Sequence, residues 1–346
     1  MFDGVPLRLS VLDQSPISEG STGSDALRKT IDLAQLADAL GYHRYWVAEH
    51  HGGPSLAGPS PEVLIGPIAS HTERMRVGSG GVMLPHYSPL KVAESFSVLS
   101  GLFPGRIDLA LGRASGTDPL TTFALQRDRR EVAPDDFPQQ LVELLGYLND
   151  DLPSEHPFAR LAKTLPGRPE TPEVWLLGSS PQSGIWAAEL GLPYSFADFI
   201  NREGAGIAEQ YRKQTQDPHV SVGIWAVCAE TDEEAERIAS SGAMMMALLR
   251  QGRLVPVPPP EKAMRFVASQ GIDLRNPQGR RRRVIGGPET VRAGIEQVAD
   301  EYGAEEVILL TITYDHQTRR RSYELIADAF GLAGARETTG AAETRR

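Results

Sequence analysis

The stretch Arg44-Tyr45-Trp46-Val47-Ala48-Glu49-His50-His51 places three ionisable side chains directly after a short apolar segment. Residues 44–48 predict a buried β-strand, so Glu49, His50 and His51 follow at its carboxyl end. Parallel α/β proteins place their active sites at that end of their strands. Neighbouring residues on extended backbone point in opposite directions. At most one of the two histidines therefore faces a shared pocket, and the other packs or bonds elsewhere.

Segments typical of strands and helices alternate along the chain on both sides of this stretch. Proline and serine mark helix starts, as at Ser60-Pro61, where serine can cap the helix and proline take its first position. Eight such units without an obvious linker predict a single (β/α)8 barrel (TIM barrel) over residues 1–331, with a disordered tail at 332–346. An open doubly wound sheet is the competing fold. The predicted strands are 7–12, 44–48, 76–83, 107–111, 174–177, 194–199, 220–228 and 307–313.

Three segments interrupt the regular alternation. Residues 113–134 are polar and irregular, and 151–173 and 252–286 are too long for plain connections, so we interpret the last two as insertions. The third segment contains a proline-rich run and four consecutive arginines at 280–283. Long irregular segments in a compact domain are usually lids or disordered loops. The arginine run is interpreted either as a solvated loop or as part of a lid that meets an anion.

Composition narrows the functional class. The chain has 346 residues, of which 40% are hydrophobic and 23% are charged, with a net charge of −10. This charge argues against a nucleic-acid partner. The single cysteine, Cys228, excludes an internal disulfide and a cysteine-based metal site. No apolar run of membrane-spanning length and no secretory signal are visible, so we expect a cytoplasmic protein without a membrane partner.

Glycines and hydroxyl side chains follow the other predicted strands. Gly78-Ser79-Gly80-Gly81 lies within the third strand and indicates a bulge, an unusual backbone or the close approach of a flat ligand; the alternative is tight packing. The fifth strand is followed by Gly178-Ser179-Ser180-Pro181-Gln182-Ser183, which opens a helix. Free N–H groups at a helix start can bind an anion. With Arg113 after the fourth strand, this segment forms a candidate monophosphate cradle.

A phosphate cradle opposite a glycine-lined wall indicates a planar phosphorylated cofactor. The sequence contains no Walker motif, and neither Gly78-Ser79-Gly80-Gly81 nor Gly112-Arg113-Ala114 matches a dinucleotide fingerprint. A mononucleotide such as FMN suits this arrangement. A metal enzyme is the least favoured class, because Glu49, His50 and His51 cannot all converge from one strand and no HExxH spacing exists.

Four stretches together resemble the bacterial-luciferase-like, flavin-dependent monooxygenases, a (β/α)8 family. The stretches are 46–51, 77–85, 103–113 and 186–193, and the resemblance extends from Leu7 to Phe330.

This resemblance assigns roles to residues at the strand ends. It implies that His50 is the active-site histidine beside the flavin ring, and that a non-proline cis peptide lies near Gly80–Gly81 under that ring. It also implies that Arg113, Ser180 and Ser183 hold the phosphate, and that 252–286 is the mobile loop that covers the site.

The activity that the resemblance implies is two-component monooxygenation. A separate NAD(P)H:FMN reductase supplies FMNH2, O2 adds at the flavin C4a atom, and the peroxyflavin passes one oxygen atom to a small organic substrate. His50 moves protons, for which we expect a near-neutral pKa. A homodimer is expected. The alternatives are a deazaflavin (F420)-dependent oxidoreductase on the same barrel and a non-catalytic flavin-binding protein.

Two positions depart from luciferase itself. Gly112 stands where luciferase has a reactive cysteine, and Gly116 falls where it has a tyrosine. Light emission from an aldehyde is therefore not expected. The smaller residues leave room for a bulkier substrate, as in the subgroup that includes tailoring oxygenases of aromatic polyketide (antibiotic) biosynthesis. Hydroxylation, epoxidation and Baeyer–Villiger insertion all remain open.

Overall fold

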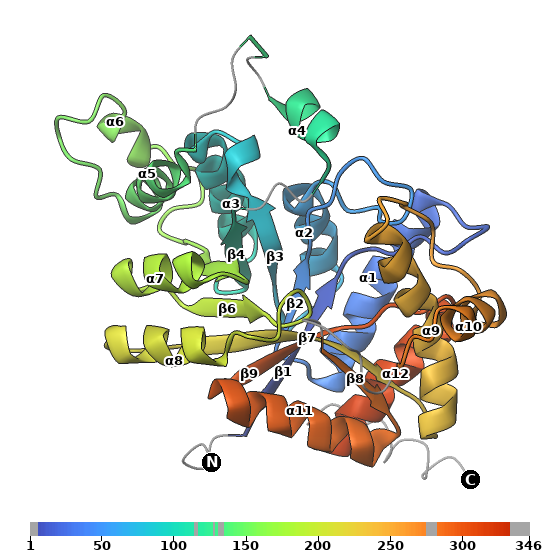
Figure 1. Cartoon of the computed structure of the whole chain (residues 1–346). Coiled ribbons are helices and arrows are strands. Elements are labelled where there is room, and N and C mark those ends of the chain that lie inside the picture. Colours follow the sequence, from blue (N-terminus) through green and yellow to red (C-terminus); the bar gives the residue numbers. More distant parts are fainter. Residues whose placement is uncertain (1–5, 114–116, 127–128, 131–134, 275–281, 333–346) are drawn as a thin grey trace.

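A computed structural model of the chain describes residues 6–113, 117–126, 129–130, 135–274 and 282–332. Within these ranges, parallel strands form one sheet in the order β6-β5-β4-β3-β2-β1-β9-β7-β8, where β8 is the short strand Arg283–Gly286, and an additional β6–β7 pairing closes the barrel (Figure 1). The predicted (β/α)8 barrel is therefore confirmed over the open sheet. Its strands are β1 (Arg8–Asp13), β2 (Arg44–Val47), β3 (Arg76–Met83), β4 (Ile107–Gly112), β5 (Glu173–Gly178), β6 (Tyr194–Ala197), β7 (Val220–Cys228) and β9 (Glu306–Leu310).

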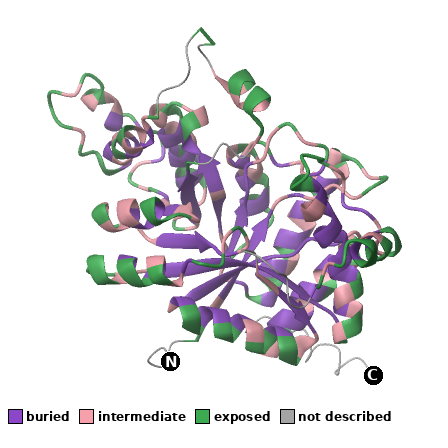
Figure 2. Ribbon diagram, viewed as in Figure 1, coloured by how far each residue is buried: buried purple, intermediate pink, exposed green. Residues whose placement is uncertain are grey.

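Helices surround the barrel and present exposed faces to solvent (Figure 2). Proline occupies the first position of α2 and α7, as expected. The serine caps are corrected: Ser60 precedes α2 but its side chain makes no cap hydrogen bond, and α1 is capped by Thr22 rather than by Ser24. The helices of the described residues are α1 (Gly23–Leu40), α2 (Pro61–Ser70), α3 (Pro89–Leu102), α4 (Pro119–Leu125), α5 (Phe137–Asn149), α6 (Ala159–Ala162), α7 (Pro181–Glu189), α8 (Ala205–Gln214), α9 (Asp232–Leu249), α10 (Pro260–Ser269), α11 (Pro288–Tyr302) and α12 (His316–Phe330), together with the short 3-10 helix η1 (Leu84–His86).

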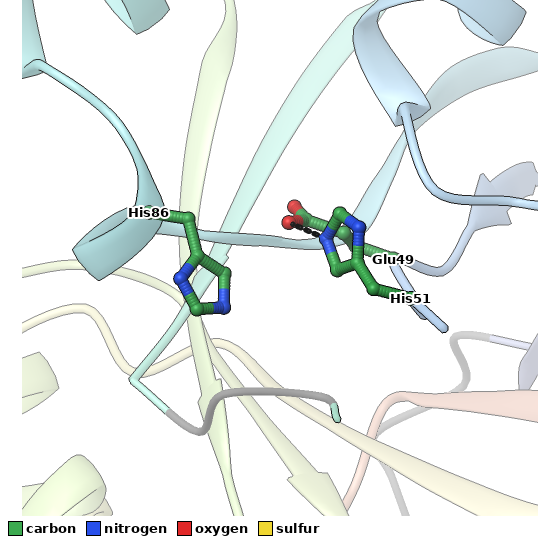
Figure 3. A group of neighbouring side chains, drawn as sticks. All are labelled: Glu49, His51 and His86. Carbon is green, nitrogen blue, oxygen red and sulfur yellow. Dashed lines mark hydrogen bonds and ion pairs between the residues drawn. The ribbon is translucent and has the colours of Figure 1, made fainter. Parts of the chain in front are cut away.

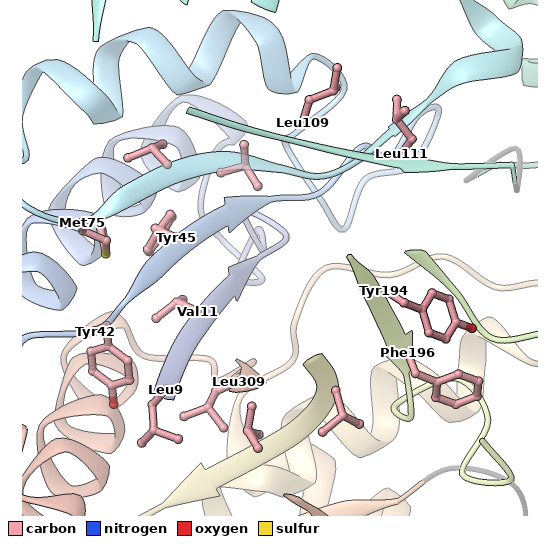
Figure 4. Packing of buried hydrophobic residues seen from close by; sticks show 14 of the residues in the cluster. Leu9, Val11, Tyr42, Tyr45, Met75, Leu109, Leu111, Tyr194, Phe196 and Leu309 are labelled. Carbon is pink, nitrogen blue, oxygen red and sulfur yellow. The ribbon is translucent and has the colours of Figure 1, made fainter. Parts of the chain in front are cut away.

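Each barrel strand is buried on both sides, but its two sides belong to different cores. In β2, Tyr45 and Val47 pack outward against the helices in the large core of Figure 4. Trp46 and Ala48 belong instead to a small apolar cluster inside the barrel, with Trp175 of β5. Alternation along extended backbone produces this division. It also fixes which side of the barrel wall the residues after β2 face.

The amino-terminal end of the barrel is filled by an ion network. Arg44 is 1% exposed and lies 2.8 Å from a carboxylate oxygen of Asp108 and 2.7 Å from one of Glu306. Asp108 accepts two further hydrogen bonds: one from Arg76, at 2.7 Å, and one from the indole N–H of Trp46. Burial opposes the charge on Arg44, but the carboxylates of Glu306 and Asp108 outweigh it and raise the pKa of the guanidinium. The network closes this end of the barrel, so the pocket lies at the other end.

The structure corrects the prediction that three connecting segments are irregular. Residues 113–134 include α4, 151–173 include the single turn α6, and 252–286 contain both α10 and the short strand β8 (Arg283–Gly286). β8 pairs with the carboxyl-terminal half of β7, outside the closed ring. α10 packs against α9. The stretch 252–286 therefore contributes regular elements, which its prolines and arginines concealed.

The predicted mobile loop and tail fall partly outside the described residues. Residues 275–281 and 333–346 lie outside them, and so does Gly116. Arg282, within the arginine run, is not solvated as one interpretation predicted: it lies 3.3 Å from Asp198 and 2.7 Å from Glu301. In the described ranges, no helix combines the length and apolar character needed to span a membrane.

Candidate active site

A pocket of about 480 Å³ lies at the carboxyl-terminal ends of β1, β2, β7 and β9. A volume of this size accommodates a small organic molecule. Its polar lining residues include Gln14, His50, His51, Thr117, Asp118 and Arg253. Its apolar lining residues include Trp225, Met245, Met246, Leu254, Leu310 and Ile312.

His50 reaches the pocket as the alternation along β2 requires. Trp46 and Ala48 face the barrel interior, so His50 follows on the same side, and its backbone N–H donates to Gly58 at 2.9 Å. Its Nδ1 atom is buried and has no hydrogen-bond partner among the described residues. Burial, with a smaller contribution from the neighbouring His51, lowers the pKa of His50 to about 4. The expected near-neutral pKa is therefore wrong, and His50 is a neutral imidazole at pH 7.

Both histidines line the pocket, so the prediction that at most one of them faces it is wrong, although His51 also bonds to a residue outside the pocket lining. Its Nε2 lies 2.7 Å from the carboxylate of Glu49, which is fully buried. The other oxygen of Glu49 accepts the backbone N–H of Met83 at 2.9 Å. Glu49 and His51 are two residues apart and share a side of the strand, so two of the three ionisable groups do meet. His86, in η1 after β3, lies beside them (Figure 3).

The peptide bond between Gly80 and Gly81 is cis, as the resemblance implies. The pairing of β3 with β4 shifts register between Gly80 and Val82, which matches the predicted bulge. A Cβ atom on Gly80 would lie 2.7 Å from Leu12 and 2.9 Å from Trp46. On Gly81 it would lie 2.6 Å from the carbonyl oxygen of Ala110. Close packing between strands therefore requires these glycines whether or not a ligand approaches them.

Arg113 follows β4 and lies beside α7. Its guanidinium stacks over the ring of Trp186 at 5.6 Å, and it lies 3.9 Å from a carboxylate oxygen of Asp135. The Arg113 side chain is 51% exposed, so its charge is accessible from solvent. The structure therefore places Arg113 against α7, at Trp186 within the helix whose start the sequence assigns to phosphate binding.

The start of α7 has the uncapped backbone N–H groups of an anion site, but the hydroxyl of Ser183 is already engaged in hydrogen bonds. The exposed Ser180 makes no side-chain cap bond, so backbone N–H groups of the first turn have no cap partner from it. Ser183 packs so closely against Gly178 that a side chain at residue 178 would clash: a Cβ atom there would lie 2.5 Å from the Oγ of Ser183. Ser183 donates to the Ser180 carbonyl at 2.7 Å and lies 3.0 Å from the hydroxyl of Tyr194. Ser179 is half-buried, and its carbonyl accepts from Asn201. The phosphate roles of these residues stay predictions.

The segment after α9 supplies part of the pocket wall. Gly252 adopts a positive φ of 73°, which ends α9 and turns the chain toward Arg253 and Leu254. Val257 then exchanges two 2.8 Å backbone bonds with Ile17 and Glu19. This part of the predicted mobile loop is therefore fixed to the barrel while covering one side of the pocket.

Sequence reasoning missed the wall of the pocket and its neighbouring histidine. Met245 and Met246 lie in an apolar stretch of α9 that is typical of core, and only the fold shows that they reach the pocket. His86 follows β3 within a segment that the resemblance had already included, yet no spacing rule links it to Glu49. The two-residue separation of Glu49 and His51 was the one signal that indicated a shared face.

Comparisons with known proteins agree with this geometry. A family model described as luciferase-like monooxygenase matches residues 7–306. The chain is 38% identical over 331 residues to N-acetyl-S-alkylcysteine monooxygenase of Bacillus subtilis strain 168, covering 93% of this chain and 98% of the relative. It is 37% identical over 329 residues to a luciferase-like monooxygenase of Escherichia coli K12, covering 93% and 96%. The crystal structure of apo-MsnO8 matches with a TM-score of 0.85 at 40% identity, covering 94% of this chain and 98% of that one.

Proposed function

Because this chain belongs to the luciferase-like monooxygenase family, we propose that it is the oxygenating component of a two-component enzyme that uses FMNH2 and O2. One observation carries the proposal: a neutral histidine, whose buried Nδ1 has no hydrogen-bond partner among the described residues, lies in the wall of a largely apolar pocket at the carboxyl ends of the strands. Reduced FMN, when bound, supplies two electrons to O2, so that one oxygen atom enters the substrate and the other leaves as water.

The residues that would bind the phosphate of FMN follow two neighbouring strands, β4 and β5, at the carboxyl-terminal end of the barrel. Arg113 and the start of α7, with Gly178, Ser179 and Ser180, would hold the phosphate through a charge-assisted bond and backbone N–H groups. The missing side-chain cap at Ser180 fits this role, because it leaves donors for an anion. Ser183 would support the turn through its bond to the Ser180 carbonyl rather than bind phosphate itself.

His50 would act as a neutral hydrogen-bonding group rather than as an imidazolium. With its pKa near 4, it donates from one ring nitrogen and accepts at the other throughout the neutral pH range. The apolar wall formed by Trp225, Met245 and Leu310 would exclude water from the reacting atoms. Exclusion of water favours oxygen transfer to the substrate over release of hydrogen peroxide.

The pocket suggests a substrate with an apolar body and an anionic group. Arg253 is the cation in the described pocket lining, and its side chain has no ion-pair partner among the described residues. Asp118 is engaged in capping α4. An S-alkyl chain and a carboxylate, as in the N-acetyl-S-alkylcysteine named for one relative, match these two features. A bulkier aromatic polyketide, as in antibiotic biosynthesis, is the second candidate substrate.

The partners follow from the same proposal. A transient NAD(P)H:FMN reductase would supply FMNH2, and we propose that both proteins act in the cytoplasm. A homodimer is proposed because Val63 on α2 and Val98 on α3 line one groove while 68% and 45% exposed. Light scattering of the wild type and a Val63→Glu variant tests the dimer: the variant should be monomeric.

The function is tested with a purified FMN reductase, NADH, isotopically labelled O2 and the two substrate classes. The expected result is a product that carries one labelled oxygen atom. Turnover of substrate without O2, with reduced F420 in place of FMNH2, would favour the deazaflavin alternative. Tight flavin binding without product from either class would favour the non-catalytic alternative.

A further inference from the structure

Three potential metal ligands converge beside the pocket from two neighbouring strand ends. Glu49 and His51 follow β2, and His86 ends η1 directly after β3. One ligand atom from each lies within 4.8 Å of the other two. The rings of His51 and His86 pack edge to face at 5.7 Å (Figure 3). Two imidazoles and one carboxylate are a ligand set that binds Zn²⁺ and other divalent transition ions with positions left for water.

The surroundings hold these ligands in place. Glu49 accepts bonds from the backbone N–H of Met83 and from the hydroxyl of Tyr87. Such outer contacts orient metal ligands and raise affinity. His51 has an 11% exposed side chain and lines the pocket, so an ion can reach it from solvent. The carboxylate of Glu49 would bind the ion from a fixed position, and the two histidines would complete the ligand set.

A second acidic side chain, Glu62 on α2, lies close to Glu49. Burial and the nearby charge of Glu49 raise the pKa of Glu62, and its Oε2 has no hydrogen-bond partner in the described part of the chain. A cation beside Glu49 would offset the repulsion between these two acids. The Glu49–His51 hydrogen bond alone does not require His86 to lie beside it.

We propose that Glu49, His51 and His86 form a binding site for one divalent transition-metal ion, with Zn²⁺ as the representative ligand. The ion would link the ends of β2 and β3 across the segment that borders the pocket. It would replace the His51–Glu49 hydrogen bond with two metal–ligand bonds. The site is separate from the proposed flavin chemistry, and its occupancy does not depend on that proposal.

The test titrates Zn²⁺ into the full-length protein after dialysis against a chelator, with calorimetry to measure affinity and stoichiometry. Co²⁺ serves as a second probe, because its visible absorption reports coordination by histidine. His86→Phe keeps a ring beside His51 but removes the ligand atom, so affinity should fall by more than the roughly 10–100-fold that loss of a residue supporting a ligand costs. His86→Cys supplies a thiolate ligand and should retain binding. His71→Ala, at an exposed histidine after α2, is the matched control and should bind as the wild type does.

One equivalent of ion bound by the wild type and the control, and lost in His86→Phe, supports the site. Circular dichroism of each variant shows whether it is folded before the titration is read. Absence of one-to-one binding in the wild type overturns the proposal. So does equal affinity in the wild type and a folded His86→Phe variant, which would place the ion elsewhere on the surface.

Discussion

The two ends of the barrel hold ionisable groups in different states. At the amino-terminal end, Arg44 lies between the carboxylates of Asp108 and Glu306 at hydrogen-bond distance. At the carboxyl-terminal end, His50 follows the same strand and lines the pocket, yet its Nδ1 has no partner among the described residues. Both residues come from one stretch of eight. Pairing at the first end stabilises the fold, whereas the unpaired atom at the second remains available to a ligand.

Removing the central cation of the paired end should have the largest effect. Arg44→Met leaves Glu306 and Asp108 buried without that counter-ion, and loss of one member of a buried ion pair costs about 3–5 kcal/mol. Denaturant unfolding measures the loss. Arg8→Met is the matched control, because Arg8 pairs at 3.3 Å with Glu305 and both are about one-third exposed; it should cost about 0–1 kcal/mol. Equal costs for the two variants would contradict a difference between buried and exposed pairs.

The corresponding change at the unpaired end should leave stability nearly intact and reduce turnover. His50→Ala removes a ring whose Nδ1 has no hydrogen-bond partner among the described residues. We expect turnover to fall on the order of 10²-fold, as for loss of a hydrogen-bonding group directed at the reacting atoms. Steady-state assays and denaturant unfolding measure the two effects. Full activity in His50→Ala would rule out its role, and a loss of stability as large as that of Arg44→Met would remove the contrast between the ends.

A third variant separates phosphate binding from ring binding. Arg113→Ala should weaken binding of reduced FMN by about 1.5–3 kcal/mol, the usual contribution of a charge-assisted hydrogen bond. Anaerobic titration monitored by flavin fluorescence measures it. Riboflavin, which lacks the phosphate, should bind wild type and variant alike. If both flavins lose the same affinity, Arg113 acts on the ring or on the fold around Trp186.

The sequence predicted the barrel because its signals are local and repeated. Apolar segments such as 220–228, and helix starts such as Ser60-Pro61, identify each unit without knowledge of the others. The strand β8 was missed because it begins within an arginine run, and its pairing with β7 supplies the stability that its own residues do not predict. α10 was missed because it follows directly on the proline-rich run 255–260, which is typical of irregular chain, and because its packing partner is α9.

The candidate site was predictable only where one short segment contains the information. His50 was found because it follows a strand directly, and alternation decides which way it faces. Its pKa was not predictable, because the burial that lowers it comes from residues distant in sequence. Met245 and His86 reach the site through the fold alone, since neither lies at a spacing that relates it to His50.

The lowered pKa of His50 should also make the free energy of unfolding depend on pH, which can be measured without a substrate. The folded-state pKa of His50 is about 4, against an ordinary value of 6.5. Between these values the unfolded chain binds a proton that the folded chain does not, so stability falls as the pH decreases from 6.5 toward 4. The contribution is at most about 1.4 kcal/mol for each pH unit. His43, whose pKa burial also lowers to about 4, adds a slope of the same sign.

Comparison of variants isolates the part that belongs to His50. Unfolding free energies of the wild type and His50→Gln, measured by urea denaturation from pH 7 to pH 4.5, should diverge in slope because glutamine does not titrate. The variant should lose stability more gradually as the solution is acidified. His71→Gln changes an exposed histidine and should follow the wild type. Parallel curves for wild type and His50→Gln would mean that His50 is as solvated in the folded protein as in the unfolded chain. In that case the free Nδ1 would be bonded to water, and the contrast between the two barrel ends would reduce to the ion network alone.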